Sequence, residues 1–157
     1  MGIKMNYMKE QLVHLAKRHN NNKRPYLLVN PLQGKHIPVE PHKSFALFQE
    51  LSQRLYASYP NEKLLIIGFA ETATAIGAAI AVNSPLDTYY IHTTRETLEQ
   101  ADYLYFTESH SHATEQKLVC NHLEDFITKT DRIIFVEDEV TTGNTILNII
   151  NLLNIIH

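Results

Sequence analysis

Short apolar runs alternate with stretches of helical periodicity along this chain, and that alternation narrows the choice of fold more than any other pattern. The run at residues 64–68 precedes the alanine-rich stretch 72–82, and the run at residues 132–136 precedes the isoleucine- and leucine-rich stretch 145–156. Strands without polar alternation are typical of sheets that are covered on both faces. Strands that alternate with helices are typical of parallel sheets. The sequence therefore predicts an α/β fold with a mostly parallel sheet and helices on both faces.

Weaker patterns predict the remaining elements of what we expect to be a single domain over residues 1–157. Residues 1–25 should form an amphipathic N-terminal helix, over 5–19, and a polar connector. Ser44 is the expected N-cap of a second helix, which Pro60 ends. Residues 31–43, which include three prolines, should form a loop. Further strands are expected at 26–30, 89–93, 103–107 and 118–120.

Composition excludes several classes of protein. The chain has the length of one domain, and its 14 basic against 17 acidic residues do not fit a general nucleic-acid binder. Cys120 is the single cysteine, so no internal disulfide can form and a reducing, cytoplasmic setting is expected.

The window 64–82 is long and apolar, but Glu71 lies near its centre and its character changes midway, from β-branched and leucine residues to alanine. We therefore interpret it as strand, turn and helix, and expect no membrane partner.

The segment 133–145 combines features that fit a phosphorylated sugar. Glu137 and Asp138 directly follow the apolar strand, and the turn 141–145, Thr-Thr-Gly-Asn-Thr, leads into the helix. Ligands of open α/β sheets bind beyond the carboxyl ends of the strands. The turn offers backbone N–H groups, hydroxyls and a helix N-terminus to a phosphate, and adjacent carboxylates can accept hydrogen bonds from a vicinal diol. The pattern predicts a pocket for ribose 5-phosphate; the alternative is a solvated acidic turn in which a threonine caps the helix.

This segment resembles the phosphoribosyl-pyrophosphate (PRPP) motif of type I phosphoribosyltransferases. The resemblance implies that Glu137 and Asp138 hold the ribose hydroxyls and that the turn wraps the 5-phosphate. The residues implied in phosphate binding are Thr141, Thr142, Gly143, Asn144 and Thr145. The resemblance also implies Mg²⁺ as the cofactor, brought in on the diphosphate of PRPP rather than held directly by protein ligands. Asn144 stands where many members have glycine, and Glu139 stands where an apolar residue is usual.

Two more segments fit the same family. The residues implied in pyrophosphate binding are Phe69, Ala70, Glu71 and Thr72, between a strand and a helix. The alternative there is an ordinary turn in which the threonine caps the helix. The polar stretch 106–116 sits where the family carries a mobile loop, and we expect His110 and His112 to assist the departing pyrophosphate. Arg95 and Lys117 would neutralise its charge. A metal site and a solvated loop are the other interpretations of the two histidines.

A narrower resemblance rests on the segments 30–36, 90–96 and 108–112. These segments are similar to the orotate-phosphoribosyltransferase-like proteins of bacterial tellurite-resistance and stress gene clusters. The resemblance implies that residues 30–36 belong to a variable hood that recognises the acceptor. We therefore predict transfer of the 5-phosphoribosyl group from PRPP to a nucleobase-like nitrogen acceptor, with release of pyrophosphate. The alternatives are a regulatory module that binds PRPP without turnover and a structural α/β domain without a ligand.

The chain ends one helix after the PRPP motif, at His157. The family fold continues with at least one more strand, so we expect a C-terminally truncated domain that lacks the last strand of the sheet. The apolar final helix would then have an uncovered face. Apolar exposure of that kind favours self-association, and we expect a homodimer.

Overall fold

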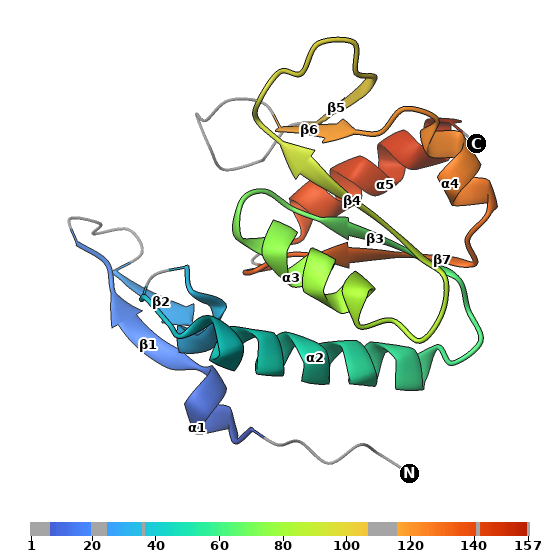
Figure 1. Ribbon diagram of the computed structural model, residues 1–157. Coiled ribbons are helices and arrows are strands. Elements are labelled where there is room, and N and C mark those ends of the chain that lie inside the picture. Colours follow the sequence, from blue (N-terminus) through green and yellow to red (C-terminus); the bar gives the residue numbers. More distant parts are fainter. Residues whose placement is uncertain (1–6, 20–24, 36, 107–115, 141, 157) are drawn as a thin grey trace.

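A computed structural model describes residues 7–19, 25–35, 37–106, 116–140 and 142–156 of the chain (Figure 1). The main strands are β3 (Leu64–Gly68), β4 (Thr88–Thr94), β5 (Tyr103–Phe106), β6 (Gln116–Val119) and β7 (Arg132–Val136). The main helices are α2 (Pro41–Ser58), α3 (Thr72–Val82), α4 (Leu123–Thr128) and α5 (Asn144–Ile156). The strands form a five-stranded mixed sheet in the order β5-β6-β4-β3-β7. Helices α2 and α3 lie on one side of it, and α4 and α5 lie on the other (Figure 1), which confirms the predicted α/β fold.

Strand β3 forms the centre of the hydrophobic core. All five of its residues are buried, and it pairs in parallel with β4 on one side and with β7 on the other. Consecutive apolar residues fit this position because helices cover both faces of the sheet. Strands β6 and β5 continue the sheet beyond β4 in antiparallel orientation. The apolar window 64–82 is thus a strand and a helix, as predicted, and no helix in the described ranges is long and apolar enough to cross a membrane.

Helix α3 packs closely against the sheet. A Cβ added to Gly77 would lie 3.0 Å from a ring carbon of Tyr90 and 3.4 Å from the Cα of Gly68. The Tyr90 hydroxyl in turn donates a hydrogen bond to the carbonyl of Thr74, across 2.7 Å. This close approach fixes the short connection between β3 and α3, which is one side of the candidate site.

Two helices differ from the prediction. Helix α2 starts at Pro41 with Glu40 in the N-cap position, and Ser44 is buried inside the helix, so the expected Ser44 cap is wrong. Proline fits the first turn because its missing N–H would have no partner there. Helix α4 was not predicted. Its Phe126 packs against Tyr89 of the sheet with ring centroids 4.8 Å apart, so tertiary contact rather than local periodicity stabilises it.

The N-terminal region departs most from the prediction of a helix over residues 5–19. Its described residues form the four-residue helix α1 (Lys9–Leu12) and the strand β1 (His14–Lys17). Strand β1 pairs in antiparallel orientation with β2 (Tyr26–Val29), and the short helix η1 (Pro31–Gln33) follows. Pairing between strands supplies backbone hydrogen bonds that override helical spacing. This hairpin and η1 lie beside the start of α2 (Figure 1), and we call β1, β2 and residues 30–35 the hood.

Candidate functional site

Two loops leave the same edge of the sheet next to each other. Gly68 and Val136 are partners at the carboxyl ends of β3 and β7. One residue further on, the N–H of Phe69 donates to the Val136 carbonyl across 3.0 Å. Loop 69–71 and segment 137–143 therefore begin side by side, at the edge where open α/β sheets bind their ligands.

The acidic pair lies at the start of the second segment. Glu137 and Asp138 are both half-buried, and the Asp138 N–H donates to Glu137 Oε1 across 3.2 Å. Burial, followed by the hydrogen bond and the negative charge of Asp138, raises the pKa of Glu137 to about 8. At neutral pH Glu137 is therefore mostly protonated. The pair carries roughly one negative charge instead of two, which lowers its repulsion of an anionic ligand.

The hood contributes a cation that the sequence analysis did not single out. Lys35 Nζ forms an ion pair with Asp138 Oδ2, and Gln33 Nε2 donates to the Asp138 carbonyl across 3.0 Å. Burial by itself raises the pKa of Asp138, but the hydrogen bond from Lys35 and the other contacts outweigh it and hold this pKa below its usual value. Lys35 and Asp138 are 103 positions apart. Polar residues in a proline-rich loop were the only signal in the sequence, and they did not identify the partner.

The turn after the acidic pair ends in an open helix N-terminus. Helix α5 begins at Asn144, and Gly143 before it has a φ of +75°. Nothing lies within 4 Å of the place where a Gly143 Cβ would be, so the backbone conformation rather than space favours glycine. The Asn144 N–H lies 3.4 Å from the Thr142 hydroxyl oxygen, a long contact that a phosphate oxygen can replace. Thr142 and Asn144 are exposed and Thr145 is half-buried, whereas Thr141 lies outside the described residues.

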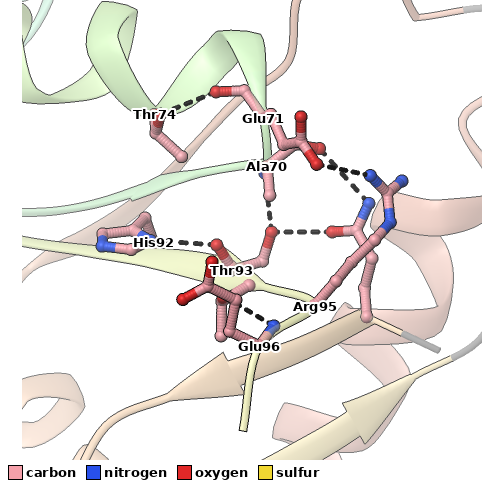
Figure 2. Close-up of polar contacts among 9 residues, drawn as sticks. Ala70, Glu71, Thr74, His92, Thr93, Arg95 and Glu96 are labelled. Atoms are coloured by element: carbon pink, nitrogen blue, oxygen red, sulfur yellow. Dashed lines mark hydrogen bonds and ion pairs between the residues drawn. The ribbon is translucent and has the colours of Figure 1, made fainter. Parts of the chain in front are cut away.

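Loop 69–71 is held from the neighbouring strand β4 (Figure 2). The Ala70 N–H donates to the Thr93 hydroxyl across 2.7 Å. Arg95, just beyond the end of β4, forms an ion pair with Glu71 across 3.2 Å. The peptide bond between Ala70 and Glu71 is cis. The structure therefore brings Arg95 to the loop where the predicted pyrophosphate-binding residues lie.

The other predicted residues take different places. The side chain of Phe69 belongs to the core, at 1% exposure, so only its backbone is available to a ligand. Thr72 opens α3 with Glu71 in the N-cap position and no side-chain cap, so the interpretation of Thr72 as the cap is wrong. His110 and His112 lie outside the described residues. In the ranges that the structure describes, no three His, Cys, Asp or Glu side chains gather where they could hold a metal ion.

Among the described residues, Lys117 contacts neither the acidic pair nor loop 69–71. Its Nζ donates to the Thr97 hydroxyl across 2.7 Å and lies over the ring of Tyr103, 5.2 Å from the centroid. Consecutive residues of a strand point to opposite faces. The preceding residue, Gln116, points toward the loop, where its Nε2 donates to the Ala70 carbonyl across 3.3 Å. Sequence reasoning missed Gln116, because a polar residue at the start of a strand carries no distinctive signal.

Two cavities flank the acidic pair beneath the hood. One, of about 260 Å³, has apolar walls from α2 and reaches Glu137. The other, of about 270 Å³, is lined by Lys35 and Asp138. Asn30 and Gln33 of the hood line both. A small molecule in either cavity would therefore contact both the hood and the acidic pair.

The fold and this edge define an α/β protein whose candidate ligand site joins paired carboxyl groups, a glycine turn at a helix N-terminus and a strand–helix loop. Comparison with family models then identifies the chain: the family described as phosphoribosyl transferase matches residues 12–156, and the protein belongs to this family. The match runs from the end of α1 to the last residue of α5. No curated protein matches the chain significantly. Membership confirms the predicted phosphoribosyltransferase and makes a transferase activity the expected function.

Proposed function

We propose that the protein transfers the 5-phosphoribosyl group from PRPP to a nucleobase-like nitrogen acceptor and releases pyrophosphate. The observation that carries this proposal is the meeting of the two loops at one edge of the sheet. The acidic pair and the turn 142–145 provide a ribose 5-phosphate subsite, with Thr141 as a further member. Loop 69–72 provides a diphosphate subsite directly beside it, because the Phe69 N–H is bonded to the end of β7.

The reaction needs no protein nucleophile. The bond between the anomeric carbon and the pyrophosphate oxygen breaks, and its electron pair leaves with pyrophosphate. The acceptor nitrogen supplies the electron pair for the new carbon–nitrogen bond and loses its proton, where it carries one, to solvent. The chain's contribution is to position both reactants and to stabilise the separated charges. Arg95 at the loop is the described cation best placed to stabilise the departing diphosphate.

The Mg²⁺ ion of the family fits as an ion carried by the diphosphate. The described residues offer no ready-made cluster of metal ligands, but Asp138 is held ionised beside the ribose subsite. When bound, the ion would neutralise charge on the leaving group. Asp138 and Glu137 are the carboxyl groups that would face it, and Asp138 is the one that carries charge at neutral pH.

Binding of a ribose hydroxyl at Asp138 Oδ2 would displace Lys35. Asp138 Oδ2 already accepts from Lys35 Nζ, and a ribose hydroxyl would compete for the same oxygen. Release of Lys35 loosens one of the hood's two contacts with Asp138, while the Gln33 contact is to the backbone carbonyl and can remain. The hood would thus respond to occupation of the site, and Lys35 would become available to the anionic ligand.

The acceptor is proposed to bind beneath the hood. The larger part of the first cavity is apolar, which suits the faces of a single small ring compound. The charged wall residues Glu50 and Arg54 form an ion pair, and Glu137 is mostly protonated at neutral pH, so an acceptor with uncharged hydrogen-bonding groups fits this cavity. The resemblance to proteins of tellurite-resistance and stress gene clusters, the homodimer and the cytoplasmic setting stay predictions.

A regulatory module that binds PRPP without turnover is the second candidate. The Lys35–Asp138 ion pair favours it, because a site that changes its hood contact on binding can report the ligand. Pyrophosphate release in a panel of nitrogen bases separates the two candidates. Release with any base establishes the transferase, and binding without release across the panel establishes the regulatory module.

Calorimetric titration with PRPP, with and without Mg²⁺, tests the site itself. We expect Mg²⁺-dependent binding that Asp138→Asn weakens at least tenfold. Asp87→Asn is the matched control, because it removes the same charge from an exposed position just before β4, at the opposite edge of the sheet. Equal binding by the Asp138→Asn variant and the unchanged chain would overturn the site assignment.

A further inference from the structure

Two polar side chains are buried where the sheet meets loop 69–71. Thr93 of β4 is 0% exposed and Gln116 of β6 is 2% exposed. A buried hydroxyl or amide without a partner costs free energy comparable to a lost hydrogen bond. Apolar side chains would fill the same space without that risk. The presence of two buried polar side chains at this place therefore indicates a role beyond packing.

The two side chains form a closed ring of hydrogen bonds with Ala70 (Figure 2). The Ala70 N–H donates to Thr93 Oγ1 across 2.7 Å, and Thr93 Oγ1 donates to Gln116 Oε1 across 2.7 Å. Gln116 Nε2 then donates to the Ala70 carbonyl across 3.3 Å. The Thr93 hydroxyl has a single hydrogen, and the Ala70 N–H can only donate, so every direction in this ring is determined. The ring holds both backbone polar groups of Ala70.

This arrangement holds the backbone of loop 69–71 in place. The Ala70 carbonyl oxygen, which would repel a diphosphate, is occupied by the hydrogen bond from Gln116. Because a peptide group is planar, holding that oxygen also fixes the plane that carries the Glu71 N–H. Arg95 adds a further restraint through its ion pair with the Glu71 carboxylate. The backbone of the loop is thus held in one conformation before a ligand arrives.

We propose that Thr93 and Gln116 are positioning residues that preorganise loop 69–71 for a diphosphate. They act through Ala70 and touch no ligand themselves. The inference rests on the proposed function, since it assumes that the loop receives the diphosphate of PRPP. It assigns a role to two residues that lie on neighbouring strands, outside both loops of the site.

Comparing two ligands separates this role from a merely structural one. PRPP carries the diphosphate, whereas ribose 5-phosphate occupies only the subsite at the acidic pair and the turn. Thr93→Val removes the hydroxyl at nearly constant shape and leaves the Ala70 N–H unheld. We expect PRPP to bind roughly tenfold more weakly to this variant, the loss that corresponds to about one hydrogen bond, and ribose 5-phosphate to bind unchanged. Thr93→Ser keeps the hydroxyl and should restore PRPP binding.

Titration calorimetry of both ligands, with thermal unfolding of each variant, decides the question. If Thr93→Val does not unfold cooperatively, Gln116→Asn replaces it, because it keeps an amide but draws the N–H₂ group back from the Ala70 oxygen. Loss of affinity for PRPP alone supports the positioning role. Equal loss for both ligands, or no loss for either, overturns it and leaves the proposed function standing. If the unchanged chain binds neither ligand, the proposed function fails and the positioning role fails with it.

Discussion

Replacing Glu137 by glutamine should stabilise the unliganded protein at alkaline pH and leave its stability nearly unchanged at acidic pH. Burial, together with Asp138, raises the pKa of Glu137 from 4.5 to about 8. Below pH 4.5 this carboxyl is protonated in the folded and the unfolded chain alike. Between pH 4.5 and 8 the folded chain keeps the proton that the unfolded chain loses, so the stability of the protein falls as pH rises. Glutamine carries no charge at any pH and escapes this penalty.

The size of the effect follows from the shift. At 1.36 kcal/mol for each pKa unit, a change from 4.5 to about 8 sets an upper limit of roughly 5 kcal/mol. Glu137 is only half-buried, and solvent screening reduces the cost of charging it. We therefore expect the glutamine variant to gain about 2 kcal/mol over the unchanged chain at pH 9, relative to the difference at pH 4.5.

Urea denaturation at a series of pH values from 4.5 to 9 measures this difference directly. Glu139→Gln is the matched control, because it removes a carboxylate from an exposed position of the same segment. The gain of Glu137→Gln over the unchanged chain should grow through the range and level off above pH 8. A gain that is constant with pH, or that shrinks as pH rises, would refute the argument that Glu137 is protonated in the folded protein.

Three further predictions concern the hood, the loop and the last helix. Lys35→Met should lower the free energy of unfolding by about 1 kcal/mol at pH 7, because the ion pair holds the pKa of Asp138 below its usual value. That contribution is lost as pH falls through the pKa of Asp138 in the folded protein. Equal shifts of the urea midpoint at pH 7 and pH 2.5 would contradict the prediction. Gly68→Ala should cost about 1–3 kcal/mol in thermal unfolding, since its Cβ would lie 2.8 Å from the Ala73 carbonyl oxygen; a melting temperature equal to that of the unchanged chain would show that the backbone gives way freely. Leu147 on α5 is 55% exposed, so the expected homodimer should dissociate on Leu147→Glu, and a gel-filtration profile of a monomer for the unchanged chain at high concentration would rule the dimer out.

The local sequence was sufficient to predict the elements that do not depend on one particular distant residue. The consecutive apolar residues of β3 and β7 predicted strands, and the two pair in parallel. Strand β3 is central and fully buried, whereas β7 lies at the edge of the sheet and is mostly half-buried. The acidic pair and the glycine turn follow β7 directly along the chain, so their position at the carboxyl edge needed only the direction of that strand. The family match over residues 12–156 agrees with this local reading.

Tertiary structure alone decided the features that depend on distant partners. Residues 14–17 became a strand because β2 lies beside them, although their spacing fits a helix. Lys35 meets Asp138, and Gln116 meets Ala70, only after the chain has folded. Hydrogen bonds and ion pairs join atoms that are adjacent in space, and the periodicity of a segment reports only which of its faces is apolar. The sequence therefore determined the order of the elements and the core of the site, and the folded chain decided what surrounds it.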